Sequence, residues 1–258
     1  MNKISKAFEG KKAFIAFITG GDPDIETTEN LIIAMAKSGV DIIEIGIPFS
    51  DPVAEGIVIQ EADERALAGG CTVDKLFDMV TSVRQSVDTP ILFMSYINPI
   101  FVYGKERFME KCSQCGIDGV IVPDLPFEER DEIAAECLKY GIAQVSMIAP
   151  TSQERIDSIA EASQGFVYCV SSLGVTGVRS EINTNIAEMI EQVKNVSNTP
   201  CAVGFGISTP EQARDMAARS DGVIIGSAIV KLVAQYGTQS VEPVTQFVRN
   251  VSDAILSV

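Results

Sequence analysis

The chain has 258 residues, of which 46% are hydrophobic and 21% charged, as in an ordinary globular protein able to bury a full core. Its formal net charge of −15 argues against nucleic acids and anionic membranes as partners, because both attract basic surfaces. The longest apolar runs fall short of the ~18 residues that a membrane-spanning helix needs, and the basic N-terminus lacks the apolar centre of a signal peptide. We therefore expect a cytoplasmic protein.

Strand-like segments recur along the chain in a regular order. Each is short, rich in β-branched residues and bounded by Gly, Pro or Asp, as buried parallel strands are. They span residues 13–19, 42–48, 90–96, 119–124, 143–150, 165–172, 200–207 and 221–229. Amphipathic helical segments lie between them, several of which end in Gly or start at Thr-Pro.

This alternation predicts the fold class. Eight strands, each followed by a helix, within about 250 residues are typical of a (β/α)8 TIM barrel in the α/β class. No linker or change of composition divides the chain, so we predict a single barrel domain over residues 1–258 with extra helices. The helical segment at 72–87, before the third strand, is interpreted as an addition to the barrel.

The cysteines and the missing histidine exclude several chemistries. The chain contains six cysteines and no histidine, and Cys112 and Cys115 form its single Cys-x-x-Cys pair. A tetrahedral zinc site needs four nitrogen or sulfur ligands, so we expect no metal site and interpret the cysteines as reduced, packed thiols. Ser-His-Asp and Cys-His mechanisms are excluded outright, because both need an imidazole.

One carboxylate lies within the second strand and another lies in the loop that follows it. Glu44 lies within the apolar run at 41–48, and if Ile43 and Ile45 face the helices, Glu44 points into the barrel. Burial there would raise its pKa and suit it to proton transfer near neutral pH. The alternative is a glutamate paired with a base, but no basic residue lies at a matching strand end. Glu55, in the following loop, is equally compatible with a solvated surface acid.

Glycines gather after the last three strands. They occur at 174–177, at 204–206 and at Gly226, which precedes Ser227. Glycine lets backbone N–H groups approach a ligand closely, and TIM barrels often bind phosphate at the loops after strands 7 and 8 beside a helix N-terminus. One glycine-rich segment alone would indicate only a tight turn. Three that converge on the same end of the barrel predict a phosphate site.

The segments "EIGIPFSDPVAEG", "PDLP", "SSLGVTG", "GFGIS" and "GSAIV" stand in an order that resembles the α subunit of tryptophan synthase along essentially the whole chain. The resemblance implies retro-aldol cleavage of indole-3-glycerol phosphate to indole and glyceraldehyde 3-phosphate, without a metal or organic cofactor. It also implies a partner, the pyridoxal-phosphate β subunit, which receives the indole through a tunnel in an αββα tetramer.

The resemblance assigns roles to individual residues. Glu44 becomes the general acid and base for the C3 and hydroxyl protons, and Glu55 becomes the second carboxylate, which accepts from the indole N–H. The remaining assignments are Phe17, Ile59, Met94, Tyr96 and Asp124 in the indole pocket, Tyr168 and Thr176 beside the substrate chain, and Gly177, Gly206, Gly226 and Ser227 at the phosphate. Thr176 is also the family's partner for the second carboxylate. Taken singly, each of these aromatic and apolar positions is better explained as an ordinary core residue.

The chain departs from the family pattern at two positions. Glu55 stands where the family usually has Asp, and Ile57 stands where it has Pro. The longer arm adds roughly 1.5 Å, one C–C bond. A misplacement of ~1 Å can cost on the order of 10²-fold in rate, and losing a proline loosens a loop that must close. Arg179 could contact the phosphate or face solvent.

Alternatives to a working α subunit stay open. One is a stand-alone indole-releasing lyase of the same family, although Asp51, Pro52 and Asn98, which the family uses near the β subunit, are present. Another is a catalytically weak α chain that acts mainly as an allosteric partner of the β subunit, for which Glu55 is the support. A further alternative is another phosphate-sugar barrel, such as a ribulose-phosphate epimerase or a phosphoribosyl isomerase. The epimerases rely on histidines and a metal, and this chain has no histidine.

Overall fold

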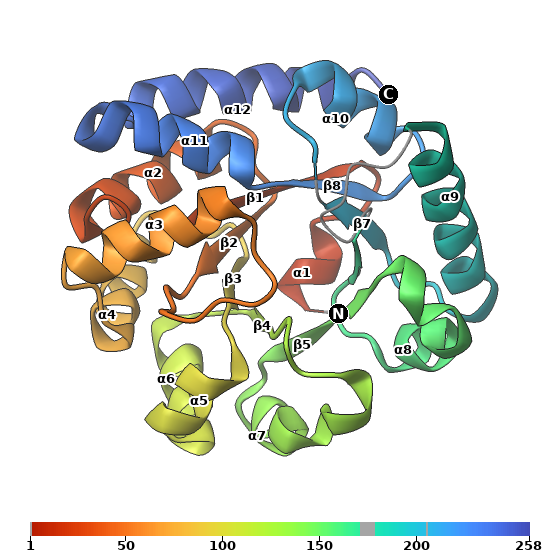
Figure 1. Cartoon of the computed structure of the whole chain (residues 1–258), viewed down its shortest axis with the longest axis horizontal. Helices are drawn as coiled ribbons and strands as arrows, with labels where there is room; N and C mark the ends of the chain where they lie inside the picture. Colours follow the sequence, from red (N-terminus) through yellow and green to blue (C-terminus); the bar gives the residue numbers. More distant parts are fainter. Residues whose placement is uncertain (1, 171–178, 205) are drawn as a thin grey trace.

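The computed structural model describes residues 2–170, 179–204 and 206–258, and its centre is a closed parallel barrel in the strand order β1 to β8 (Figure 1). The strands are β1 (Ala13–Thr19), β2 (Ile42–Gly46), β3 (Ile91–Met94), β4 (Gly119–Ile121), β5 (Ala143–Ile148), β6 (Val167–Val170), β7 (Cys201–Gly204) and β8 (Gly222–Ile225). The (β/α)8 barrel predicted from the alternating pattern is confirmed.

Helices surround the barrel between the strands. They are α1 (Lys3–Lys6), α2 (Ile25–Lys37), α3 (Ile57–Ala68), α4 (Val73–Val83), α5 (Ile97–Tyr103), α6 (Lys105–Cys115), α7 (Asp131–Tyr140), α8 (Ile156–Ala162), α9 (Arg179–Val196), α10 (Pro210–Ala217), α11 (Ser227–Tyr236) and α12 (Val241–Leu256). Short 3-10 turns are η1 (Phe127–Glu129), η2 (Pro150–Arg155) and η3 (Gly237–Gln239). Polar side chains cap several starts, as where Asp24 accepts from the N–H of Thr27 at 2.7 Å.

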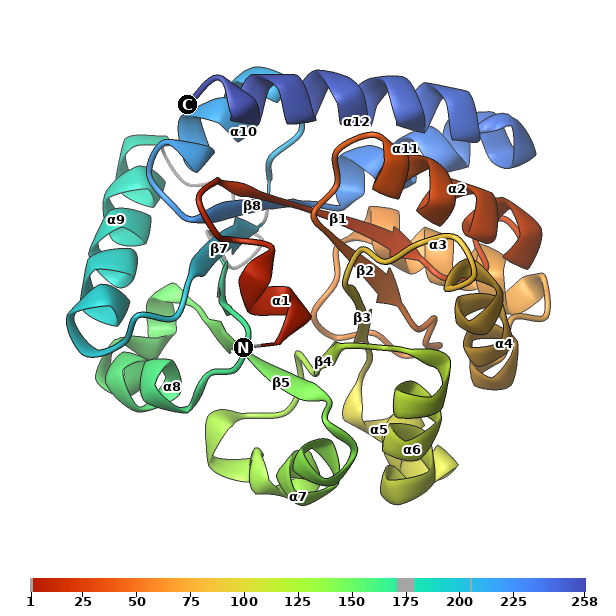
Figure 2. The same ribbon diagram turned by 180° about the vertical axis from the view of Figure 1, so that it is seen from behind.

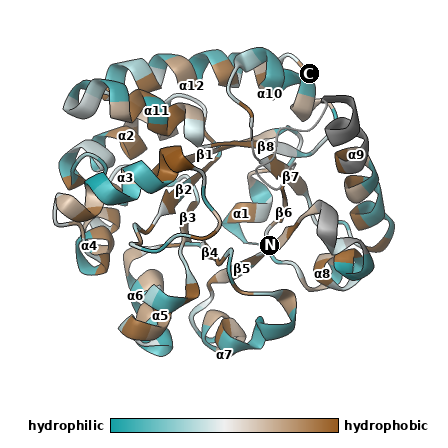
Figure 3. Cartoon of the chain, viewed as in Figure 1, coloured by the Kyte–Doolittle hydropathy of each residue, from teal (hydrophilic) through white to brown (hydrophobic). Residues whose placement is uncertain are grey.

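Each strand contributes to two cores at once. In β1, Phe14 and Ile18 pack outward with the ring helices, whereas Ile15 packs inward with strand residues such as Leu92. Both faces are therefore apolar, which explains the continuous hydrophobic runs in the sequence. Figure 3 shows these hydrophobic colours along β1 and β8.

The strands end earlier than the sequence suggests. The segment expected at 42–48 stops at Gly46, and the one expected at 119–124 stops at Ile121. Pro48 and Pro123 follow these ends, and proline has no N–H to donate to a ladder. The residues freed from the strands form the loops at the mouth of the barrel.

The interpretation of 72–87 as an added helix is wrong. Helix α4 in this segment buries Leu76, Phe77 and Val80 in the main core and packs between α2 and α6, so it belongs to the ring. The additional helix is α3, which packs against β1 and α11 and lies in front of β1 and β2 in Figure 1. The error arose because α3 alone is long enough to be the crossover helix.

The N-terminal end of the barrel is closed by α1, which lies over the opening in the view from behind (Figure 2). Ile4 is fully buried there with Phe8 and the inward side chains of the strands. A Cβ on Gly119 or Gly165 would lie 3.1 Å and 2.9 Å from Ile4, so glycine at both positions makes room for the plug.

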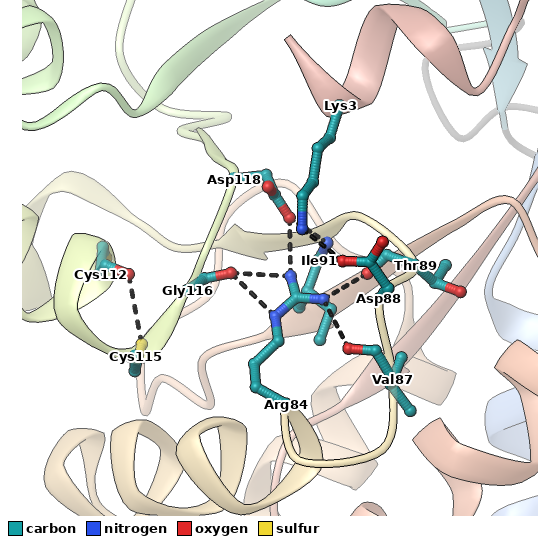
Figure 4. A network of polar contacts seen from close by, with 10 residues as sticks. All are labelled: Lys3, Arg84, Val87, Asp88, Thr89, Ile91, Cys112, Cys115, Gly116 and Asp118. Carbon is teal, nitrogen blue, oxygen red and sulfur yellow. Dashed lines mark hydrogen bonds and ion pairs between the residues drawn. The ribbon is translucent and has the colours of Figure 1, made fainter.

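Aspartates fasten this closed end at three places. Asp41, Asp118 and Asp221 each precede a strand and accept the N–H of the first or second residue of the strand before it, at 2.9 Å in every case. Each also forms an ion pair, with Lys11, Arg84 and Lys194 respectively. Figure 4 shows the Arg84 network.

The described residues include no helix long and apolar enough to cross a membrane. All six cysteines are buried and free, which confirms the expectation of packed thiols. Burial raises the pKa of the Cys115 thiol to about 11, so it stays protonated at neutral pH.

Candidate active site

A cavity of about 550 Å³ opens at the C-terminal end of the barrel. TIM barrels place their reactive groups at this end, because the loops that follow all eight strands meet there. Its lining includes Phe17, Glu55, Ile59, Met94, Tyr168, Gly206, Gly226 and Ser227, all of which the sequence pointed to. Phe17 and Ile59 pack together as its apolar wall.

Glu44 lies in the barrel interior beneath this cavity. Its neighbour across the β1–β2 ladder is Phe17, and its side chain is fully buried. Neither carboxyl oxygen has a hydrogen-bond partner, and burial raises the pKa of Glu44 to about 8. Ile43 and Ile45 pack outward with the helices, as expected. An unpaired, largely protonated acid therefore stands next to an apolar cavity, as proton transfer at neutral pH requires.

Glycines make room for the aromatic walls around Glu44. A Cβ on Gly46 would lie 2.7 Å from the ring of Phe17, and a Cβ on Gly204 would lie 2.5 Å from the hydroxyl of Tyr168. Tyr168 is buried, and the negative charge of Glu44 contributes to the raised pKa of its hydroxyl after burial itself. Glycine at Gly204 is thus explained by packing, where the sequence suggested close approach to a phosphate.

Glu55 is half-buried at the edge of the cavity, in the loop 47–56 between β2 and α3. The hydroxyl of Tyr96 donates to Glu55 and accepts the N–H groups of Val53 at 3.0 Å and Ala54 at 2.8 Å. Burial raises the pKa of Glu55, and the Tyr96 hydrogen bond opposes that rise. The loop is therefore fixed to Tyr96 at the start of α5, and the carboxylate of Glu55 lines the cavity.

Tyr96 and Asp124 support the site from behind. Neither lines the cavity: Tyr96 acts through Glu55, and Asp124 accepts the N–H of Ile97 at 2.9 Å at the start of α5. The charge of Asp124 also acts on Glu55 and raises its pKa. The indole-pocket role expected for both residues stays a prediction, and the contacts described here reach the site through Glu55 and the start of α5.

The opposite end of the cavity is polar. Gly226 precedes α11, Ser227 is the first residue of that helix, and Gly206 after β7 has a φ of 77°, which favours glycine. Ser208 and Lys231 also line this end, and the sequence interpretation missed both. Lys231 lies four residues after Ser227, one helical turn along the same face, so helical spacing could have revealed it. A helix N-terminus, a hydroxyl and an ammonium together suit an anion.

Comparison with known proteins gives the family. The model of the tryptophan synthase alpha chain family matches residues 4–255. The chain belongs to the tryptophan synthase alpha chain family. It is 46% identical to the tryptophan synthase alpha chain of Lacticaseibacillus casei over 255 residues, which cover 99% of this chain and 96% of the relative.

Solved structures of tryptophan synthase subunits have the same fold. The alpha subunit from Legionella pneumophila superposes with a TM-score of 0.91 at 36% identity, over 100% of both chains. A chain of the α2β2 complex from the hyperthermophile Pyrococcus furiosus superposes with a TM-score of 0.87 at 35% identity, over 96% of this chain and 99% of that one. Members of the tryptophan synthase alpha chain family are lyases that cleave indole-3-glycerol phosphate.

Some expected site residues lie outside the described residues. Thr176 and Gly177 fall in the segment 171–178, and the side chain of Arg179 is likewise not described. Their assigned contacts with substrate and phosphate stay predictions. Asp63, a buried carboxyl of α3, is a residue that sequence reasoning missed, because a charged residue in a helix normally reads as a solvated one.

Proposed function

We propose that this chain cleaves indole-3-glycerol phosphate by a retro-aldol reaction in tryptophan biosynthesis, with Glu44 as general acid and base. The observation that carries the proposal is Glu44 itself. Its carboxyl is fully buried and unpaired, with a pKa of about 8, beneath a cavity whose walls include Phe17 and Tyr168.

One carboxyl can serve both proton transfers. Protonated Glu44 gives its proton to indole C3, which leaves a positive charge on the ring. The resulting carboxylate then takes the proton of the glyceryl hydroxyl while the bond between indole C3 and the hydroxyl-bearing carbon breaks. The bonding electrons return to the ring, so indole and an aldehyde leave and Glu44 is protonated again. Because the carboxyl is covered in the described chain, its side chain must rotate toward the cavity for this step.

Glu55 is the second carboxylate in this proposal. It accepts the indole N–H and stabilises the positive charge that reaches the ring nitrogen in the transition state. Tyr96 holds Glu55 and the preceding loop backbone, which limits the freedom of its longer arm. Desolvation at the cavity edge strengthens the attraction between this carboxylate and the developing cation.

The polar end of the cavity would bind the phosphate. The backbone N–H groups of Gly206 and Gly226 and the hydroxyl of Ser227 are suited to donate hydrogen bonds to phosphate oxygens at the start of α11, and Lys231 adds a positive charge. These local donors matter because the chain as a whole carries a net charge of −15, which repels an anionic substrate.

We also propose a β subunit as partner, in an αββα tetramer in the cytoplasm. The relative from Pyrococcus furiosus assembles as an α2β2 complex. In this chain, Val53 in loop 47–56 and Val102 in α5 are each 81% exposed. The hydrogen bonds of Tyr96 join these two segments. Phe101 and Ile57 add to this apolar rim, which suits a protein partner beside the cavity.

The test is Glu44→Gln, with the exposed Glu64→Gln of α3 as the matched control. We expect Glu44→Gln to lower turnover by at least about 10²-fold, because an amide cannot deliver the proton, while the binding of indole-3-glycerol phosphate persists. Indole release in single-turnover assays and equilibrium binding of the substrate measure the two effects. Near-normal turnover in Glu44→Gln would remove Glu44 from the mechanism.

A further inference from the structure

A second cavity, of about 640 Å³, lies over the outer side of β5, next to the substrate cavity. Its lining extends from Phe127 of η1 and Arg130 at the start of α7 to Arg155 of η2 and Ile159 of α8. Volumes of roughly 300–1,000 Å³ are typical of sites that bind small organic molecules. The proposed reaction uses none of these four side chains.

The cavity exists because the ring of helices is open over β5. Helix α7 packs against α6 and β5, and α8 packs against α9 and β5, whereas α7 and α8 have no comparable contact with each other. Figure 1 and Figure 2 show the two helices apart. The hydrophobic core divides at the same place, because Ile133 of α7 belongs to one cluster and Ile156 and Ile159 of α8 belong to another.

The outer face of β5 is polar where the neighbouring strands are apolar. By strand alternation Gln144 and Ser146 point to this face, and both are half-buried, whereas Val120 of β4 and Val167 of β6 are fully buried in apolar clusters. The side-chain amide of Gln144 donates to the carbonyl of Arg130 at 3.2 Å. The hydroxyl of Ser146 lines the cavity and has no hydrogen-bond partner within the described residues. This face therefore offers both space and an unused polar group.

Two arginines line the cavity, and one of them lacks a counter-charge. Arg155 donates to both carboxyl oxygens of Glu128 at 3.0 Å, so its charge is balanced in an exposed ion pair. The guanidinium of Arg130 lies 5.5 Å from the centre of the Phe127 ring, and no acidic side chain of the described residues pairs with it. In a chain with a net charge of −15, an arginine that faces a cavity without an acidic partner is suited to bind an anion.

We propose that this cavity is a second ligand site, which binds a small carboxylate with an apolar body. The guanidinium of Arg130 pairs with the carboxylate, and Ser146 and Gln144 supply further hydrogen bonds. The apolar body packs against Phe127 and Ile159. A single unpaired guanidinium balances one negative charge, which favours a carboxylate over a phosphate group that carries nearly two.

The second cavity and the substrate cavity share a wall. The end of loop 47–56, Pro123 and Met147 line both of them. A ligand in the second cavity therefore lies against the segment that carries Glu55. If the ligand changes the position of this wall, it changes the affinity for substrate, and substrate changes the affinity for the ligand by the same factor.

The experiment measures the binding of naphthylacetate and of its neutral amide, naphthylacetamide, to the purified chain by isothermal titration calorimetry. We expect one saturable site for naphthylacetate and at least about tenfold weaker binding of the amide, which cannot pair with a guanidinium. Arg130→Gln should weaken the binding of naphthylacetate by a similar factor. Arg219→Gln removes an exposed arginine elsewhere and should bind as wild type does. Equal affinities for the acid and the amide, or no saturable binding, would overturn the proposal.

Two further variants separate the two cavities. Ser146→Leu fills the second cavity, so it should abolish binding while Tm stays the same or rises. Ser227→Ala alters the substrate cavity and should leave the binding of naphthylacetate unchanged. Binding that is lost in Ser227→Ala but kept in Arg130→Gln would place the ligand in the substrate cavity. A lower Tm in Ser146→Leu would show that this position is already closely packed, and would also overturn the proposal.

None of these measurements requires cleavage of a substrate. A chain that binds naphthylacetate through Arg130 but releases no indole keeps the second site and refutes only the proposed function. A chain that releases indole but does not bind naphthylacetate keeps the proposed function and refutes only the second site.

Discussion

Glu44 occupies a position where a carboxyl is costly. Each pKa unit by which burial raises it corresponds to about 1.4 kcal/mol of lost interaction with water for the charged form. The described structure supplies no hydrogen bond in return. Because the folded-state pKa of about 8 is above the ordinary 4.5, folding is penalised progressively as the pH rises from 4.5 to 8. Because Glu44 destabilises the fold and forms no compensating hydrogen bond, its presence is best explained by a role in proton transfer.

Ser227 supplies the sharpest prediction for the phosphate end of the cavity. We expect Ser227→Ala to raise KM by roughly tenfold or more with little change in kcat, because a hydrogen bond to a charged group is worth about 1.5–3 kcal/mol and this one acts equally in the ground and transition states. Steady-state kinetics of indole release measure both constants. Ser113→Ala, an exposed serine of α6, is the control. An unchanged KM in Ser227→Ala would place the phosphate elsewhere.

Sequence reasoning predicted residues whose role follows from strand alternation and missed those whose role follows from tertiary contacts. Glu44 could be placed inside the barrel because its neighbours Ile43 and Ile45 had to face the helices. Asp63 could not, because only the packing of α3 against the barrel buries it. Tyr96 was assigned to the indole pocket, whereas its hydroxyl holds loop 47–56. No local pattern encodes a hydrogen bond across 43 positions.

At the level of strands and helices too, local sequence patterns were predictive and tertiary packing was not foreseen. The pattern of apolar runs located all eight strands, but β2 and β4 end earlier than expected, just before Pro48 and Pro123. The two helices between β2 and β3 could not be ranked from sequence, since both are amphipathic. Packing decides between them: α4 fills the space between α2 and α6, and α3 covers the mouth beside β1.

The closed end of the barrel allows stability to be tested apart from activity. The Arg84 guanidinium donates to the carbonyls of Gly116 and Thr89 and to Asp118 at 2.7 Å, and Asp118 in turn accepts the N–H of Ile91 (Figure 4). These contacts join the end of α4 to β3 and β4, far from the cavity at the other end. Residues at this end of a TIM barrel are expected to contribute to stability rather than to catalysis.

We therefore expect Arg84→Ala to lower the free energy of unfolding by about 2–4 kcal/mol, because it leaves Asp118 and the part-buried carbonyls of Val87, Thr89 and Gly116 without their donor. Turnover measured well below the unfolding temperature should stay unchanged. Denaturant unfolding and indole release give the two values. Arg219→Ala removes an exposed arginine of the same size and should affect neither. A loss of turnover in the folded Arg84 variant would show that the two ends of the barrel are coupled.

The whole molecule concentrates its unusual features on one face. The cavity, the Tyr96–Glu55 contact and the exposed Val53 and Val102 all lie at the C-terminal end of the barrel. A partner that covered the apolar rim would also exclude water from Glu55 and hold loop 47–56 in place. Electrostatic stabilisation of the ring cation would then increase, because a drier site has a lower dielectric constant.

The last experiment measures indole release by purified wild type and Glu55→Asp, each with and without a β subunit. It tests whether a partner holds loop 47–56 in place and whether Glu55, which replaces the usual aspartate, works as the second carboxylate. If Tyr96 and the partner hold the longer arm at the right place, the β subunit accelerates wild-type cleavage strongly and Glu55→Asp does no better. The shorter side chain would then lose its Tyr96 contact and the loop its anchor. If wild type is inactive in both conditions and Glu55→Asp restores cleavage, the chain acts mainly as an allosteric partner. High wild-type activity that ignores the β subunit would instead indicate a stand-alone lyase.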